Sequence, residues 1–498
     1  MNTYDAIVIG AGNGGLVGAL TLAKAGKKVL LLEKHNIPGG AATTFVRGRF
    51  EFDVALHTLW GIGTDDNKGA LREIFEKLDV YDKLEFVEQK EIFTLNVKDR
   101  FKADFPYEKS AYLDTLCAIS PDEADNIRAY QDLLDRMAEE FYRLYDHLGE
   151  DINEENFPLM FEMGARSGEE VLHSYIKHPV IRAAYSILDG YTGIHVSKIP
   201  FLLLGCLYEL GGGHHVKGGA QAMSNAIIEE FEACGGRVIY HAEVDKINID
   251  NNQVTGVHLK DGREFQANRI LSNANKVRTY VDFIDEKQVP ESLFMNLKPS
   301  KPGSSIFALY IGLNCSPDKI GLENGINYLM DPSIKSITAD ARNNNIDWAN
   351  SVYMSCYNID DPDYSEPNTS AITVLVGNNV EPWMNLSQQE YHDRKFKLAD
   401  NVLDLLEKFH PGIRDHIEEL ELSTPLTHMR YLGSPGGAIY SHSANFKDLI
   451  TNKLDPRSPI EGLYFCGASI IVGGFNGTYM TGHSVGSLML KEMTEEAA

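Results

Sequence analysis

The chain has 498 residues, of which 43% are hydrophobic and 23% charged, and its formal net charge is −25. This length exceeds what one hydrophobic core serves, so we expect two or more interleaved domains. The acidic excess disfavours binding to nucleic acid, which is itself a polyanion, and electrostatic adsorption to anionic membranes. The six cysteines form no CxxC pair, which favours a reduced, cytoplasmic protein without a metal site.

The first 33 residues have the pattern of a nucleotide-binding fold. Residues 4–9 (YDAIVI) form an apolar strand, and GAGNGG follows at Gly10–Gly15. Residues 16–26 have helical spacing, and residues 27–33 (KKVLLLE) form a second apolar strand. This order of strand, glycine turn, helix and strand is the one that a dinucleotide fold requires.

The glycines and the acidic residue that this fold needs stand at the expected spacing. Gly10 permits the tight turn, Gly12 lets the backbone approach a pyrophosphate, and Gly15 lets the helix pack close to the strand. Glu33 lies where a carboxylate accepts hydrogen bonds from ribose hydroxyls. The motif alone fits FAD or NAD, whereas its place at the start of the chain and the Gly39–Gly40 pair beyond Glu33 favour FAD.

The stretch GGAATTFVRGRFEFDVALH follows, and it ends at His57. Its centre predicts two strands joined at Arg47–Gly48, with Phe45, Phe50 and Phe52 packing inward. The diglycine at its start lets the chain pass close to a cofactor. We therefore expect the stretch to run beside a flavin.

Residues 65–204 are rich in helical patterns and form a predicted substrate or lid domain. Within them, IPFLLLGCLY (199–208) is the longest apolar run, and it is too short to span a bilayer. The run indicates a buried helix. A lipophilic tunnel wall and a peripheral membrane contact are the alternatives.

The α/β pattern returns at residues 205–285 and again at 451–498, and mixed strands and helices fill 286–450. Predicted elements are a helix at 216–236, strands at 306–313, 351–359 and 371–377, a helix at 388–409, and a strand, glycine loop and helix at 462–493. The predicted fold class is therefore α/β. A discontinuous Rossmann-like FAD-binding domain (1–64, 205–285 and 451–498) holds an inserted mixed α+β substrate domain (65–204 and 286–450).

Four blocks of the sequence resemble, in order, the motifs of one flavoenzyme family. They are GAGNGGLVGALTLAKAGKKVLLLEK with PGG, KGGAQAMSNAI with GGRV and LSNAN, PLTHMRYLGSPGGAIY, and GLYFCGASIIVGGFNGTYMTGH. The family is that of phytoene desaturase, carotenoid isomerase and retinol saturase, whose fold is amine-oxidase-like. The resemblance covers the whole length in outline, and FDVALHTLWG is more similar to retinol saturase because of its histidine.

The resemblance implies a set of FAD contacts. Three departures accompany it: Ala41 stands where arginine is frequent after the diglycine, Val216 stands where proline is frequent, and His214–His215 stand where an aromatic residue is frequent. The implied cofactor residues are Gly10, Gly12, Gly15, Glu33, Lys34, Gly40, Ala41, Thr58, Val244, Asn273, Ala274, Gly467, Ala468, Phe475, Asn476 and Gly477.

Five further residues are candidates for the reaction itself. His57 is expected at the substrate face of the flavin as a proton donor or hydrogen-bond partner, the alternative being a packing histidine. Tyr431 and Tyr440 are expected to stack on a conjugated chain, the alternative being ordinary core aromatics. His214 and His215 are expected to line the substrate cavity, the alternative being a solvated loop pair.

The leading hypothesis for function is an FAD enzyme that desaturates, saturates or isomerises C=C bonds of an apolar or polyene substrate. An amine-oxidase-like enzyme that oxidises a C–N bond is a second hypothesis. A flavin-fold protein that binds a lipid or a partner without turnover is a third, of another class. No second GxGxxG is present for NAD(P)H, and the sequence indicates neither the electron partner nor the oligomeric state.

Overall fold

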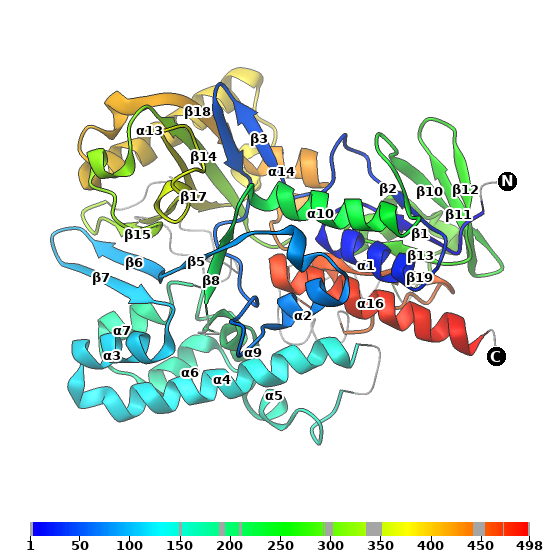
Figure 1. The fold of residues 1–498 in the computed structure, drawn as a ribbon, viewed down its shortest axis with the longest axis horizontal. Helices are drawn as coiled ribbons and strands as arrows, with labels where there is room; N and C mark the ends of the chain where they lie inside the picture. The colour runs from blue at the N-terminus through cyan, green and yellow to red at the C-terminus, as the bar shows by residue number, and fades with distance from the viewer. Residues whose placement is uncertain are drawn as a thin grey trace.

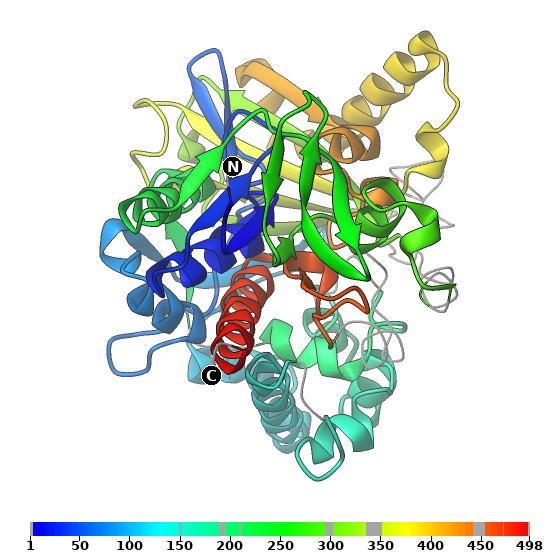
Figure 2. The ribbon, with the colours of Figure 1, turned by 90° about the vertical axis from the view of Figure 1, so that its right-hand side faces the viewer.

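The computed structural model describes residues 3–148, 152–188, 195–208, 212–291, 293, 302–334, 351–441, 454–471 and 473–496. Figure 1 shows the nucleotide-binding part at the right, a second sheet-centred part at the upper left, and a group of helices below. Figure 2 shows the same chain from the side that carries the two ends.

The nucleotide-binding part is a parallel sheet covered by helices. The order of its strands is β19-β13-β1-β2-β9, and every neighbouring pair is parallel. The strands are β1 (Ala6–Ile9), β2 (Val29–Leu32), β9 (Arg237–Ile239), β13 (Ile270–Ser272) and β19 (Leu463–Phe465). All residues of β1 and β2 are buried, as expected for strands covered on both faces.

Three helices pack together against this sheet. Helix α1 (Asn13–Lys24) contacts both α10 (Gly219–Ala233) and α16 (Phe475–Glu495), as Figure 1 shows. At the start of α1, a Cβ on Gly15 would lie 2.0 Å from the carbonyl oxygen of Gly10. Only glycine therefore allows the helix to pack this close to the turn, as the motif predicted.

An antiparallel meander follows β9 and continues the nucleotide-binding part. It consists of β10 (Val244–Asp250), β11 (Gln253–Leu259) and β12 (Glu264–Gln266). Asn251 and Asn252, between β10 and β11, have φ of +47° and +63°. Positive φ at both central residues is the geometry of a type I′ hairpin turn, which asparagine tolerates.

The second sheet is mixed and has the order β18-β14-β17-β16-β15-β6-β7. Its pairs are antiparallel except for β15 with β6. The strands are β6 (Glu91–Val97), β7 (Phe101–Pro106), β14 (Ser305–Leu313), β15 (Ile326–Met330), β16 (Ser351–Cys356), β17 (Ser370–Asn378) and β18 (Ile417–Ser423). The region 65–204 thus contributes strands as well as helices, and the predicted domain limits stay a prediction.

Two short ribbons connect the parts. The predicted hairpin is present as β3 (Thr44–Arg47) and β4 (Phe50–Asp53), and β5 (Phe86–Gln89) pairs with β8 (Gly213–Val216). Phe50 and Phe52 are buried, and the half-buried ring of Phe45 lies 4.9 Å from that of Tyr310. The three phenylalanines therefore pack inward, as predicted.

The remaining helices lie mostly below the two sheets in Figure 1. They are α2 (Ala70–Lys77), α3 (Lys109–Ile119), α4 (Ala124–Asp146), α5 (Pro158–Met163), α6 (Gly168–Tyr175), α7 (Pro179–Ala184), α9 (Phe201–Gly205), α11 (Lys276–Asp282), α13 (Gln388–Phe409) and α14 (Pro425–Leu432). Helix α13 has the predicted limits, and a capping box of Ser387 and Glu390 fixes its start.

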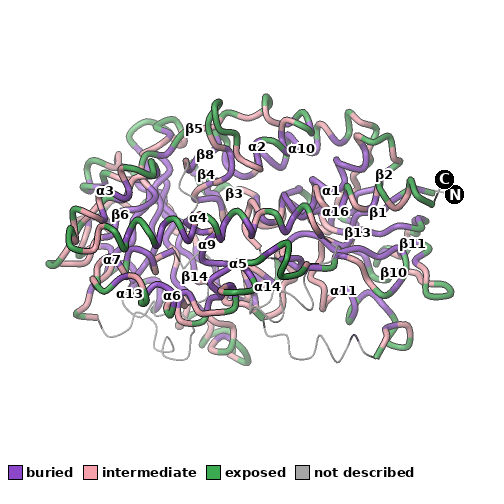
Figure 3. The backbone as a smooth tube through the Cα atoms, turned by 90° about the horizontal axis from the view of Figure 1, so that it is seen from below, coloured by how far each residue is buried: buried purple, intermediate pink, exposed green. Residues whose placement is uncertain are grey.

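The apolar run at 199–208 forms α9 and the 3₁₀ turn η3 (Cys206–Tyr208), and every residue of α9 is buried. Figure 3 shows buried backbone running through the centre of the molecule and exposed backbone at its rim. None of the helices in the described ranges has the length and apolar character needed to cross a membrane.

Candidate functional site

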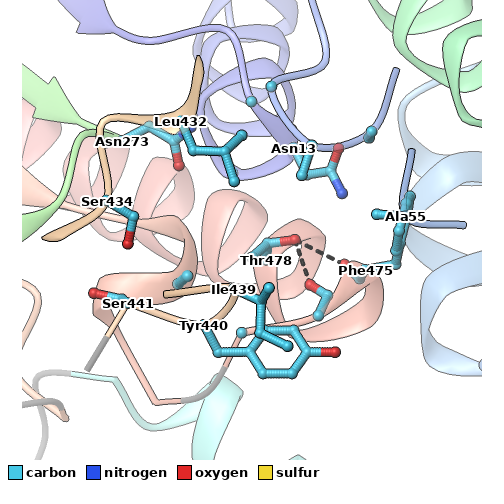
Figure 4. A pocket seen from close by; sticks show the side chains of 18 of the residues that line it. Asn13, Ala55, Asn273, Leu432, Ser434, Ile439, Tyr440, Ser441, Phe475 and Thr478 are labelled. Carbon is cyan, nitrogen blue, oxygen red and sulfur yellow. Dashed lines mark hydrogen bonds between the residues drawn. The ribbon is translucent and has the colours of Figure 1, made fainter. Parts of the chain in front are cut away.

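A cavity of about 430 Å³ lies where the parallel sheet meets the mixed sheet and the helices. Gly10, Glu33 and Asn273 line it, and each directly follows the carboxyl end of β1, β2 or β13. Ligands of open α/β sheets bind at this edge of the strands. Figure 4 shows Asn13, Asn273, Tyr440 and Phe475, from four separate segments, around this space.

Most of the predicted cofactor residues line the cavity. Two do not: Gly15 packs behind Gly10, and Gly467 lies behind Asn273, whose Oδ1 would be 2.2 Å from a Cβ at that position. The residues on the wall are Gly10, Gly12, Glu33, Lys34, Gly40, Ala41, Thr58, Val244, Asn273, Ala274, Ala468, Phe475, Asn476 and Gly477.

The described residues fit a dinucleotide cofactor. Asn13 Oδ1 and Ser434 Oγ lie on the wall, and each is buried without a hydrogen-bond partner. A Cβ on Gly12 would project into the same space, 2.8 Å from Asn273 Nδ2. The free N–H groups of the helix N-terminus beside this glycine cradle would donate to a bound pyrophosphate, whereas the acceptor Asn13 Oδ1 would pair with a donor group of the cofactor such as a hydroxyl.

The ribose end of the cavity is held by hydrogen bonds around Glu33. Its Oε2 accepts from the backbone N–H of Ala11 at 2.7 Å, and its Oε1 accepts from that of His35 at 2.9 Å. The neighbouring Lys34 also lines the cavity, and burial followed by the nearby charge of Arg278 lowers its pKa. The carboxylate is therefore oriented before any ligand binds.

The opposite end of the cavity is apolar and aromatic. It is lined by Trp60, Phe141, Tyr142, Tyr145, Leu203, Leu207, Tyr328, Tyr353 and Leu375. Leu203 and Leu207 belong to the run 199–208, for which a lipophilic tunnel wall was the alternative interpretation, whereas no sequence signal assigns the others to the site. Phe141 and Tyr145 are four residues apart on one face of α4. This end suits an apolar molecule, and aromatic rings suit a flat conjugated one.

His57 lies at the aromatic end and is 7% exposed. Its Nδ1 is 2.9 Å from the hydroxyl oxygen of Tyr357 and 3.2 Å from that of Ser355. Burial lowers the pKa of His57 to about 3. The imidazole is therefore neutral near physiological pH and hydrogen-bonded to side chains rather than to a backbone carbonyl.

The two candidate tyrosines lie in different surroundings. Tyr431 is 54% exposed, and its ring stacks at 5.8 Å on that of His35, next to the ribose end. Tyr440 packs on the glycine loop before α16, where its Cδ1 would be 2.5 Å from a Cβ on Gly473. Burial raises the pKa of Tyr440 to about 12. Both line the cavity, and their roles stay a prediction.

His214 and His215 belong to β8 and are absent from the described wall of the cavity. The backbone of His214 exchanges two hydrogen bonds with Leu59, which lies between two wall residues. The ring of His215 packs 5.6 Å from that of Tyr357, and burial lowers its pKa to about 4. Both histidines therefore lie behind the wall of the cavity, and their contact with a substrate stays a prediction.

Asp53 anchors the segment that carries His57. Its Oδ1 accepts from the backbone N–H groups of Ala55 and Leu56, and its Oδ2 accepts from that of Ala220 at 2.7 Å. The carboxyl group thus joins the end of β4 to the start of α10. Burial raises its pKa to about 7.

We expect Asp53 to make stability depend on pH. Because its folded-state pKa exceeds the unfolded value of about 3.9, the folded protein binds more protons between about pH 4 and pH 7. The contribution of Asp53 to the free energy of unfolding is therefore complete below about pH 4, and it is lost as the pH rises towards about 7. Asp53→Asn should remove this dependence of the unfolding free energy on pH. It should also lower the unfolding free energy by about 1–3 kcal/mol, since an amide N–H would face the backbone N–H of Ala220. Denaturant titrations at several pH values measure both effects. An unchanged dependence of the unfolding free energy on pH in the variant would show that Asp53 is not its source.

Comparison with known proteins places these features in a wider group. A family model described as "Flavin containing amine oxidoreductase" matches residues 14–489. Prolycopene isomerase 2 of an Oncidium hybrid cultivar is 25% identical over 97% of this chain and 84% of its own length. All-trans-retinol 13,14-reductase of Danio rerio is 26% identical (98% and 86%), and phytoene desaturase (lycopene-forming) of Pantoea ananas is 25% identical (98% and 99%). A solved oxidoreductase from Methanosarcina mazei has the same fold, with a TM-score of 0.68 at 18% identity over 98% of this chain and 99% of that one.

Proposed function

Because the chain belongs to the flavin containing amine oxidoreductase family, we propose that it is an FAD-dependent enzyme acting on carbon–carbon double bonds of an apolar, conjugated substrate. The observation that carries the proposal is the two-ended cavity. One end has the glycine turn and Glu33, and the other has an aromatic wall with the buried imidazole of His57. The names of the relatives, which include a prolycopene isomerase and an all-trans-retinol reductase, support the same substrate class.

The polar end would hold the cofactor. The N-terminus of α1 presents free N–H groups to the phosphates, and Glu33 accepts from the ribose. Ala274, Ala468 and Phe475 lie on the wall beyond these groups and would flank the ring system. A bound flavin supplies exchange of a hydride or of single electrons at its ring, whereas the protein orients the substrate.

The aromatic end would hold the substrate. Rings of Trp60, Tyr328 and Tyr353 offer flat surfaces on which a conjugated chain stacks, and leucines on α9 and η3 exclude water. His57 lies on this part of the wall. Because its imidazole is neutral, we assign it the role of hydrogen-bond donor to the reacting group and not that of a general acid.

The C–N oxidase hypothesis receives less support from the described residues. Among those that line the cavity, the lysine is Lys34, which directly follows Glu33 at the ribose end. Oxidation of a C–N bond is expected to use a lysine near the reacting part of the flavin, and the described wall offers no lysine at the aromatic end. A C–N oxidase would therefore need a different arrangement of lysine and flavin.

Anaerobic spectroscopy of the purified protein tests the proposal. We expect the visible bands of oxidised flavin, and we expect a polyene to bleach them if it is desaturated. If the substrate is saturated, the chemically reduced protein should regain the bands on adding a polyene. Isomerisation leaves the bands unchanged while chromatography shows a new geometric isomer. Primary amines are the matched control.

Three results would contradict the proposal. A protein without flavin bands after purification and after reconstitution with FAD would remove the cofactor assignment. Bleaching by amines together with no change in polyenes would favour the C–N oxidase. Binding of a polyene with no bleaching, no reoxidation and no isomer would favour the non-catalytic binder.

A further inference from the structure

Three side chains from one face of β16 and the turn after it surround His57. Strand β16 ends at Cys356, and the 3₁₀ turn η7 (Tyr357–Ile359) continues it. Alternate residues of an extended chain point to the same face, which places Tyr353, Ser355 and Tyr357 together. The ring of Tyr353 lies 5.2 Å from that of His57, and the other two approach its Nδ1 with their hydroxyl groups. We call these three residues the β16 strip.

Both hydroxyl groups of the strip meet the same ring nitrogen. A neutral imidazole has one N–H and one acceptor nitrogen, and the partner of one nitrogen decides which is which. His57 is neutral because burial lowers its pKa, and burial raises that of Tyr357 well above its usual value. Both groups are therefore neutral, and a phenol hydroxyl donates more strongly than an imidazole N–H while an imidazole nitrogen accepts more strongly than a phenol oxygen, so Tyr357 is the better donor of the pair. If it donates to Nδ1, the ring hydrogen is on Nε2.

We propose that Tyr357 and Ser355 hold His57 in the Nε2–H form, so that the imidazole is a fixed hydrogen-bond donor to the cavity. Nδ1 is occupied by the strip, which leaves Nε2 as the ring atom for the cavity that His57 lines. A donor held in place before reaction suits an oxygen or a developing negative charge on the bound molecule. Nε2–H has no lone pair to accept a proton, so His57 acts as a donor and not as a general base.

Tyr357 and Ser355 are thus positioning residues, and their effect on turnover rests on the proposed function of His57. The assignment of the ring hydrogen to Nε2 does not rest on that proposed function. It can be observed directly, because the ¹⁵N chemical shifts of an imidazole differ between protonated and unprotonated nitrogens. This separates the two claims experimentally.

The experiment uses ¹⁵N-histidine labelling of the flavin-loaded protein, with His57→Gln to identify the signals of His57. In the wild type we expect an unprotonated Nδ1 and a protonated Nε2. In the double variant Tyr357→Phe with Ser355→Ala we expect a mixture of the two forms. Its kcat should fall about tenfold with KM changed less than about twofold, as for an interaction made mainly in the transition state.

Tyr364→Phe is the matched control. The ring of Tyr364 stacks 4.7 Å from that of Tyr357, and its hydroxyl is buried without a partner, so its removal should leave the signals and turnover unchanged. A wild-type signal for Nδ1–H would overturn the inference, and so would an unchanged Nε2–H form in the double variant. An Nε2–H signal together with normal turnover in His57→Gln would support the assignment and remove the proposed role of His57.

Discussion

Gly12→Val is expected to abolish flavin binding while leaving the protein folded. The side chain would begin 2.8 Å from Asn273 Nδ2 and fill the space between the start of α1 and the cavity, which the pyrophosphate needs. We expect FAD affinity to fall at least about 100-fold, or about 2.8 kcal/mol. Turnover should be lost with the cofactor. Fluorescence titration of the flavin-free protein with FAD measures the affinity.

Gly26→Ala is the matched control for that experiment. Gly26 follows the other end of α1 with φ of +77°, and a Cβ there meets nothing within 4 Å. Alanine at this φ costs about 1 kcal/mol of stability, similar to the cost of valine in place of glycine at the N-cap of α1. Both variants should therefore unfold at similar temperatures, and only Gly12→Val should lose the flavin. Normal FAD affinity in Gly12→Val would show that the pyrophosphate does not pass Gly12.

His57→Gln is expected to slow turnover about 100-fold, within the range of a lost hydrogen-bond donor to developing negative charge. Glutamine preserves much of the volume and some hydrogen bonding, but it holds its N–H less rigidly than a ring fixed by Tyr357 and Ser355. Because His57 lies at the aromatic end, FAD affinity should be unchanged. Stopped-flow reduction or product analysis gives the rate, and the visible spectrum reports the cofactor.

His410→Gln separates a chemical effect from one of burial. His410 is also buried, its Nδ1 is 2.9 Å from the carbonyl oxygen of Ile320, and it is not on the described cavity wall. Its replacement should cost stability and leave the rate per flavin unchanged. Equal rates for His57→Gln and the wild type would make His57 a packing residue, which is the alternative that the sequence allowed.

The nucleotide-binding part could be predicted from the sequence because its signals are local. A turn between a buried strand and a helix needs glycine at Gly15, where a side chain would strike the carbonyl of Gly10, and few other folds require this at the same spacing. The φ values of Asn251 and Asn252 likewise belong to a turn that their residue types favour. In such places a segment of only a few residues already determines the local backbone geometry.

The mixed sheet could not be predicted in the same way. Strand β6 pairs with β15, which lies more than two hundred residues further on, and nothing within either strand specifies its partner. Pairing over such distances is decided by packing against the rest of the molecule. The helical patterns near α4 were evident, whereas the strands β6 and β7 beside them were not.

The reaction end of the site depends on those long-range pairings. Tyr353, Ser355 and Tyr357 alternate in SVYMSCYNI, a pattern that indicates one face of a strand without indicating what that face meets. Only the folded chain brings this face to His57, some three hundred residues away. Phe141 and Tyr145 are a similar case, since a helix with aromatic residues four apart is usually part of an ordinary core.

The last strand and helix have a consequence for how the protein is made. Strand β19 completes the parallel sheet beside β13, and α16 packs on α1, the helix that begins at the glycine turn. A nascent chain that has produced the whole turn, with Glu33 after it, still lacks this edge strand and supporting helix until residue 495 has been synthesised. Domains usually begin to fold during synthesis from the N-terminus, but here the cofactor site forms late. Under the proposed function, we therefore expect flavin to bind only after β19 and α16 have been made, and a chain truncated before β19 to bind none.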